Sequence, residues 1–262
     1  MTDIVDCTET PYLQEILKYL PINPTDEEDV IDYINNLTNL VAVNYKYGQY
    51  QFAYFGIHLL YMTYIYCEAW KISQIEPERY KDAIVFARAY NGREKDLKIE
   101  DANSIFVYSL MPEKDIARLF KIIKLDQSHI IAVSNLVDDR NEMAHATGKF
   151  EILTEELFDA KAKNVLYSIN NIHRCMESLI RKWYGQVLIQ YCNGEGEYEE
   201  YDNPNDVITE QMIQSFKIST NELLICNEMS VRNLISTYRN FQAKLEDFKA
   251  KMKQYCEEEG YV

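Results

Sequence analysis

Arg140, Asn141 and His145 lie within one short segment and carry side chains suited to cleaving a phosphodiester without a metal ion. A histidine exchanges protons near neutral pH, so it can take the 2′-hydroxyl proton of RNA or protonate the leaving oxygen. An arginine stabilises the negative charge that builds around the phosphorus. These residue types therefore suggest metal-independent RNA cleavage.

The helix predicted before His145 carries one apolar row, formed by Ile130, Val133 and Val137. Arg140 continues this row and points toward the protein or a partner, whereas Asn141 and His145 project together from one side. A guanidinium on an inward-facing row is costly unless it is paired or serves a site. We therefore expect that Asp138 or Asp139 neutralises Arg140, or that Arg140 faces a polar cleft.

The segment resembles the HEPN superfamily of helical-bundle proteins, many of which are RNA endonucleases marked by Arg, a polar residue, three variable positions and His. Arg140, Asn141 and His145 match that pattern, and a short turn followed by a long predicted helix matches its setting. The resemblance implies that His145 is the acid or base, that Arg140 clamps the phosphate and transition state, and that Asn141 positions RNA or its partner histidine. The implied product carries a 2′,3′-cyclic phosphate.

The motif occurs once in the chain, whereas two motifs of this family commonly meet in one composite site. The resemblance therefore implies a homodimer with two-fold symmetry. It also implies a toxin, antiviral or RNA-processing role, with a cognate antitoxin or regulatory protein as a further partner and no cofactor. The alternative interpretation is a noncatalytic helical module that dimerises or docks onto another protein.

The net charge of −15 argues against broad nonspecific binding to nucleic acid, because lysines and arginines supply that affinity. Any contact with RNA must then be local. Basic residues cluster in sequence around the motif, and the candidate RNA-binding residues are Lys121, Lys124 and Lys149. The competing interpretation is that these lysines lie on solvated helix faces.

Metal chemistry receives little support from the sequence. Glu142 and His145 form one Glu-x-x-His pair, but a di-iron carboxylate site needs a second pair, which the other histidines do not supply. The six cysteines lack the short spacing of thiolate metal sites and are expected to be reduced and mostly buried. His58 is expected to be a hydrogen-bonded core residue.

The composition, with 47% hydrophobic residues but only 8 Gly and 6 Pro, is typical of a packed helical protein. We predict an all-α, antiparallel helical bundle of HEPN type with an additional C-terminal helical segment. The predicted helices span about 26–46, 50–73, 77–90, 112–123, 126–144 and 154–191, with one or two more in 207–258. The predicted domains are an N-terminal extension (1–24), the bundle (25–192), an acidic loop (193–206) and a C-terminal helical extension (207–262).

The sequence also bears on location. The N-terminus is acidic and shows no basic region followed by an apolar run, so no secretory signal is expected. The stretch Gln51–Cys67 contains no Asp, Glu, Lys or Arg, but it is shorter than the roughly 20 apolar residues that a membrane span needs. We expect a buried aromatic helix in a cytoplasmic protein without membrane contact.

Overall fold

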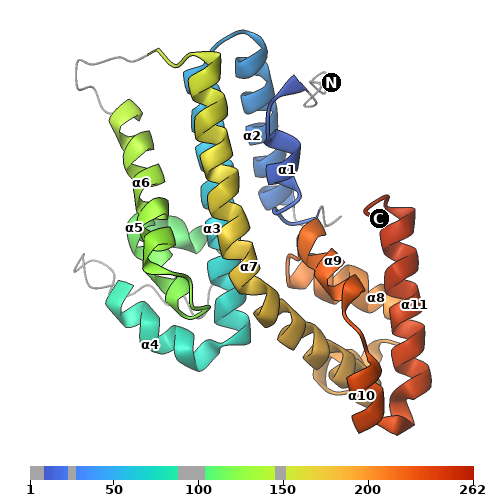
Figure 1. The fold of residues 1–262 in the computed structure, drawn as a ribbon. Helices are drawn as coiled ribbons and strands as arrows, with labels where there is room; N and C mark the ends of the chain where they lie inside the picture. The colour runs from blue at the N-terminus through green and yellow to red at the C-terminus, as the bar shows by residue number, and fades with distance from the viewer. Residues whose placement is uncertain (1–8, 23–27, 88–103, 145–151) are drawn as a thin grey trace. The chain divides into compact units, whose positions relative to one another are not determined.

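The computed structural model describes residues 9–22, 28–87, 104–144 and 152–262, and within those ranges the protein is all-α, as predicted (Figure 1). The only β-type pairing in the described ranges is an isolated bridge between Pro21 and Ser219. The chain divides into two compact units. The first comprises Met1–Leu17 and Asp29–Cys175, and the second comprises Lys18–Glu28 and Met176–Val262.

The helices of the first unit agree with most of the sequence-based predictions. They are α1 (Leu13–Leu17), α2 (Glu28–Lys46), α3 (Tyr50–Ile75), α4 (Pro77–Ala87), α5 (Glu113–Ile116), α6 (Gln127–Ala144) and the first part of α7 (Glu155–Asn193). The helix predicted over 112–123 differs, because α5 is a single turn that continues as a 3₁₀ turn, η5 (Ala117–Lys121). A second 3₁₀ segment, η4 (Ile105–Leu110), precedes α5.

Gly48 separates α2 from α3. Its φ of 69° lies in the left-handed region, which glycine adopts without steric cost. The Gly48 N–H donates to the Tyr45 carbonyl, and the Gln49 N–H donates to the Asn44 carbonyl. This pair of hydrogen bonds is a Schellman motif, which satisfies carbonyls left over at a helix end. Two adjacent helices therefore arise from one glycine in an otherwise continuous helical sequence.

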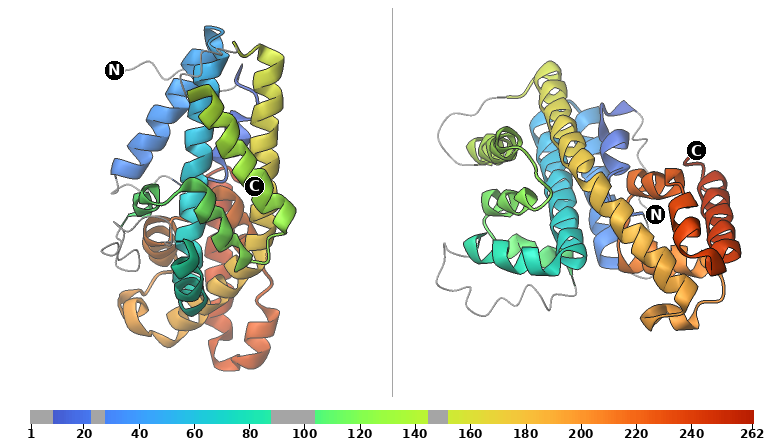
Figure 2. Two further views of the ribbon diagram at one scale, coloured as in Figure 1. Left: turned by 90° about the vertical axis from the view of Figure 1, so that its left-hand side faces the viewer. Right: turned by 60° about the horizontal axis from the view of Figure 1, so that its bottom comes forward.

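Helix α3 is the centre of the first unit, as its apolar circumference predicts. Most of its residues are buried, and α1, α4, α5 and α6 all pack against it. It runs beside the first part of α7 (Figure 2), where the Tyr61 hydroxyl lies 2.8 Å from the Ser168 hydroxyl. The Tyr64 hydroxyl donates to the Ile169 carbonyl at 3.3 Å. Both tyrosines thus bury their rings while their hydroxyls remain hydrogen-bonded.

The second unit contains the rest of α7 and several short elements. These are the 3₁₀ turn η6 (Gly196–Glu200), α8 (Pro204–Asp206), the π-helix η7 (Val207–Ser215), α9 (Thr220–Glu228), α10 (Arg232–Thr237), the 3₁₀ turn η8 (Arg239–Phe241) and α11 (Gln242–Glu258). Ser219 and Glu222 form a complete capping box at the start of α9. Trp183 of α7 stacks on Phe216 with ring centroids 3.6 Å apart. The second unit therefore has a core of its own.

Five of the six cysteines lie in the described ranges. Cys67, Cys192, Cys226 and Cys256 are buried thiols that form no disulfide among the described residues, and Cys175 is a half-buried one. Cys7 lies outside the described ranges. No helix in these ranges is both long and apolar enough to cross a bilayer.

Candidate active site at the end of helix α6

The structure describes two of the three motif residues. Arg140 and Asn141 lie in the last turns of α6, and both are half-buried. His145 lies outside the described residues, as does Lys149. The described part of the motif is therefore the arginine and the amide at the C-terminal end of one helix.

Arg140 is held by a carboxylate from another helix. Its Nη2 donates a hydrogen bond to Oε2 of Glu113, at the start of α5. The Arg140 side chain is 26% exposed and that of Glu113 is 22% exposed, so the pair lies at the wall of the unit and not in a closed core. Nε of Arg140 is buried, and among the described residues it has no hydrogen-bond partner. The guanidinium is thus oriented while some of its donors remain uncommitted.

The two acidic residues before Arg140 pair with lysines. Asp138 contacts Lys114 of α5, and Oδ2 of Asp139 accepts a hydrogen bond from Lys161 of α7 at 2.9 Å. Of the alternatives drawn from the sequence, neutralisation of Arg140 by Asp138 or Asp139 is therefore wrong. Three ion pairs tie the last turns of α6 to α5 and α7.

His58 of α3 lies against the same carboxylate. Its Nε2 is 3.7 Å from Oε2 of Glu113, and its side chain is 1% exposed. The prediction that His58 is a core residue is confirmed. The expected hydrogen bond is absent, because neither ring nitrogen has a partner within hydrogen-bond distance in the described part of the chain. Three helices thus bring His58, Glu113 and Arg140 together, and we call this group the Glu113 cluster.

The electrostatics of the Glu113 cluster favour an ionised carboxylate. Burial alone would raise the pKa of Glu113, but the neighbouring His58 and the Arg140 guanidinium outweigh it, and the pKa lies below its ordinary value of 4.5. The carboxylate is therefore negatively charged at neutral pH. That charge keeps Arg140 oriented by a charge-assisted hydrogen bond.

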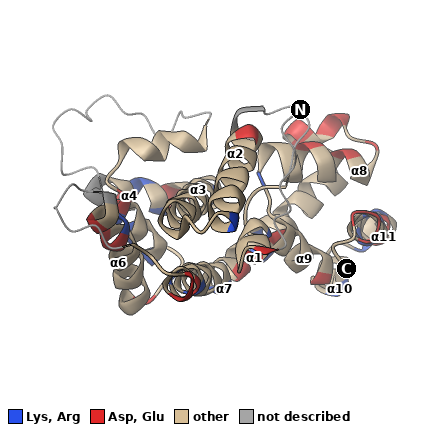
Figure 3. Ribbon diagram, turned by 90° about the horizontal axis from the view of Figure 1, so that it is seen from above, with Lys and Arg blue, Asp and Glu red and all other residues tan. Residues whose placement is uncertain are grey.

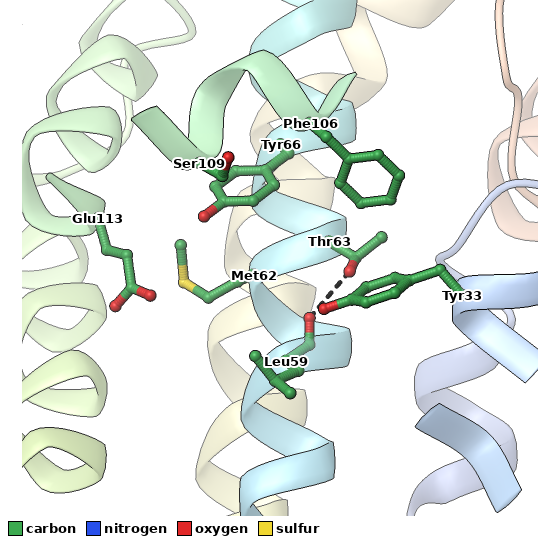
Figure 4. Close-up of a pocket in the computed structure, with 8 residues that line it drawn as sticks. All are labelled: Tyr33, Leu59, Met62, Thr63, Tyr66, Phe106, Ser109 and Glu113. Atoms are coloured by element: carbon green, nitrogen blue, oxygen red, sulfur yellow. Dashed lines mark hydrogen bonds between the residues drawn. The ribbon is translucent and has the colours of Figure 1, made fainter. Parts of the chain in front are cut away.

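A pocket of about 310 Å³ lies beside the Glu113 cluster, within the first unit (Figure 4). Four elements, α2, α3, η4 and α5, contribute to its walls. Figure 4 shows Glu113 at one side, Tyr33 and Phe106 at the other, and Met62 and Tyr66 between them. The lining residues are Tyr33, Leu59, Met62, Thr63, Tyr66, Phe106, Ser109 and Glu113, of which only Glu113 is charged. The pocket is therefore aromatic and apolar with a carboxylate at one side.

The aromatic side chains of the pocket are held in fixed relations. Tyr33 and Phe106 meet edge to face with ring centroids 5.1 Å apart. Tyr66 is 8% exposed, and burial together with the nearby Glu113 charge raises its pKa to about 12. Its hydroxyl thus stays protonated and can donate. The Thr63 hydroxyl is already used, because it donates to the Leu59 carbonyl at 2.9 Å (dashed in Figure 4).

The candidate RNA-binding lysines of the described chain lie away from Arg140. Lys121 and Lys124 precede α6, so most of this 18-residue helix, on the order of 20 Å, separates them from Arg140. Lys121 Nζ donates to the Leu125 carbonyl at 3.2 Å, and Lys124 has a φ of 63° at a turn where glycine is more usual. Both lysines are exposed. Acidic and basic residues are interspersed along the described helices (Figure 3). The structure does not bring these lysines to the Glu113 cluster.

Two members of the cluster, Glu113 and His58, were not identified as site residues from the sequence. Glu113 stands in a charged turn like many others, and His58 lies in an aromatic helix where a core role is the natural interpretation. The only signal of a site in the sequence was that His58 lies in a stretch without Asp, Glu, Lys or Arg.

Comparison of the chain with protein families, curated proteins and solved structures finds no match.

Proposed function

We propose that this protein is a metal-independent RNA endonuclease of HEPN type that cleaves at a composite site formed by two copies of the chain. The observation that carries the proposal is the position of Arg140. Its guanidinium lies at the end of α6, five residues before His145, partly exposed and oriented by Glu113 from another helix. A preoriented cation of this kind is what stabilises a phosphorane-like transition state.

Each residue then has a role in the proposed reaction. His145 or its symmetry mate takes the 2′-hydroxyl proton while the 2′-oxygen forms a bond to phosphorus. The bond from phosphorus to the 5′-oxygen breaks, and the leaving oxygen takes up a proton, which gives a 2′,3′-cyclic phosphate and a 5′-hydroxyl. Arg140 clamps the phosphate through the solvent-exposed part of its guanidinium side chain. Asn141 positions RNA, and Glu113 holds Arg140 without taking part in the proton transfers.

The experiment incubates purified full-length protein with structured RNA in excess chelator. We expect cleavage that falls by roughly 100-fold or more in Arg140→Ala and in His145→Ala, with helicity unchanged. Matched controls are Arg181→Ala, another ion-paired and partly exposed arginine, and His129→Ala, a half-buried histidine at the other end of α6. Both controls should cleave like the wild type. Equal background in all five proteins would rule the nuclease out.

Biological setting follows from the same proposal. A nuclease of this type serves as a toxin, in antiviral defence or in RNA processing, in the cytoplasm, and a toxin needs a cognate antitoxin. The homodimer is checked by measuring the mass of the protein in solution by sedimentation. A monomer at all concentrations would exclude the composite site.

A noncatalytic interaction module is the second candidate, and one observation favours it. The Glu113–Arg140 pair is one of three ion pairs that fasten α6 to its neighbours, so Arg140 has a structural use that needs no substrate. In that case Arg140→Ala lowers the free energy of unfolding, and neither the wild type nor the variant cleaves RNA. The cleavage experiment separates the two candidate functions, because only a nuclease would lose RNA cleavage in Arg140→Ala.

A further inference from the structure

The size and walls of the pocket beside Glu113 suit one flat ring system. Its volume of about 310 Å³ is at the lower end of the range for small-molecule sites, roughly 300–1,000 Å³. Tyr33, Tyr66 and Phe106 supply aromatic faces and edges, and Met62 adds an adaptable apolar contact. Unstacked nucleobases are bound in this way, by stacking on aromatic side chains.

The polar groups of the pocket divide into one strong acceptor and two hydroxyls. Arg140 and His58 both approach Oε2 of Glu113, and Oε1 has no partner among the described residues. At neutral pH this oxygen can only accept hydrogen bonds. Ser109 is exposed at the pocket, and the Tyr66 hydroxyl is a protonated donor. A ligand that fits must therefore offer N–H groups to Glu113 and an acceptor to the hydroxyls.

The four RNA bases differ in how well they meet this requirement. Guanine presents two adjacent donors, N1–H and the 2-amino group, beside the acceptor O6. Cytosine and adenine present an amino group next to a ring nitrogen that a carboxylate repels, and uracil presents one N–H between two carbonyls. Only guanine matches a carboxylate without placing an acceptor against it.

We propose that this pocket binds a guanine base of the RNA, with the Glu113 carboxylate accepting from its N1–H and 2-amino groups and Tyr33, Tyr66 and Phe106 contacting its ring. The inference rests on the proposed function, because it makes the pocket a subsite next to the phosphate that Arg140 contacts. Cleavage should accordingly occur beside guanine.

The first test measures equilibrium binding of guanosine, adenosine, cytidine and uridine to the full chain. Nucleosides lack the phosphate, so neither phosphate binding by Arg140 nor catalysis affects the result. Guanosine should bind at least tenfold tighter than the other three. Phe106→Ala, which removes a stacking ring, and Glu113→Gln, which removes the charge, should each weaken guanosine binding at least tenfold. Tyr167→Ala, which removes an exposed tyrosine of α7, should leave binding unchanged.

The second test maps the cleavage positions in RNA and distinguishes an RNA base from a free guanine nucleoside as the ligand. Cuts beside guanine that lose this preference in Phe106→Ala support the subsite. Cleavage without base preference, together with equal or no binding of the four nucleosides, overturns the inference but leaves the nuclease intact. Guanosine binding that is lost in Phe106→Ala without any RNA cleavage overturns the RNA subsite and the nuclease together, and shows a nucleoside site instead.

Discussion

Glu113 of α5 accepts its hydrogen bond from Arg140 of α6 across 27 residues of sequence, although two carboxylates directly precede Arg140 on its own helix. Helix geometry explains this choice. Residues one and two positions apart on a helix do not face each other, so Asp138 and Asp139 project away from the guanidinium. Their carboxylates meet Lys114 and Lys161 instead. The partner of Arg140 is thus determined by packing between helices.

A double-mutant cycle on Glu113 and Arg140 should reveal this coupling. Because both side chains are mostly buried and the hydrogen bond is charge-assisted, we expect a coupling energy of about 1.5–3 kcal/mol between Glu113→Gln and Arg140→Gln. The measurement is urea unfolding of the wild type, both single variants and the double variant. Glu78 and Lys81, an exposed pair at 3.4 Å on α4, are the matched control and should couple by about 0.5 kcal/mol or less. Equal coupling in both cycles would contradict the expectation.

The same carboxylate should make stability depend on pH. Because the pKa of Glu113 is lowered in the folded protein, its ionised form contributes stability above the ordinary value of 4.5, and this is lost as pH falls through the folded pKa. The loss of free energy of unfolding caused by Glu113→Gln should therefore be largest at neutral pH and should shrink below about pH 4.5. Urea unfolding of both proteins across this range provides the measurement. In an Arg140→Gln background the pH-dependent difference should be smaller, and an unchanged difference would exclude Arg140 as a cause.

The sequence predicts the elements of this fold better than it predicts the site. Periodicity and the break at Gly48 are local signals, so the bounds of α2, α3 and α7 follow closely from them. The inward position of Arg140 also follows from its place in the row of Val133 and Val137. The identity of its partner does not, because Glu113 becomes adjacent only when α5 packs on α6. The pocket depends in the same way on four elements that are distant in sequence.

Replacing either of two glycines in long helices by alanine should change the stability of the protein, in opposite directions at the two positions. A Cβ on Gly56 of α3 would lie 2.8 Å from Leu40 Cδ2 and still closer to Val41 Cγ2, so α2 approaches α3 at this residue. Gly56→Ala should therefore destabilise the protein by about 1–3 kcal/mol. Gly185 of α7 has its nearest neighbour, Met229, at 4.0 Å, so Gly185→Ala should stabilise by about 0.5–1 kcal/mol. Thermal and urea unfolding measure both, and a loss of stability in Gly185→Ala would contradict the second expectation.

Helix α3 also buries a charged pair directly after its uncharged stretch. Lys71 Nζ donates to Oε1 of Glu68 at 2.8 Å, and the two side chains are 0% and 1% exposed. Two charges removed from water depend on each other, because losing either partner removes a charge-assisted hydrogen bond from the core. Glu68→Met and Lys71→Met should each cost about 1.5–3 kcal/mol, the range for a lost hydrogen bond to a charged group, and the double variant should lose less than the sum of the two. Urea unfolding of the four proteins measures this, and single-variant losses that simply add in the double variant would show that the pair is not coupled.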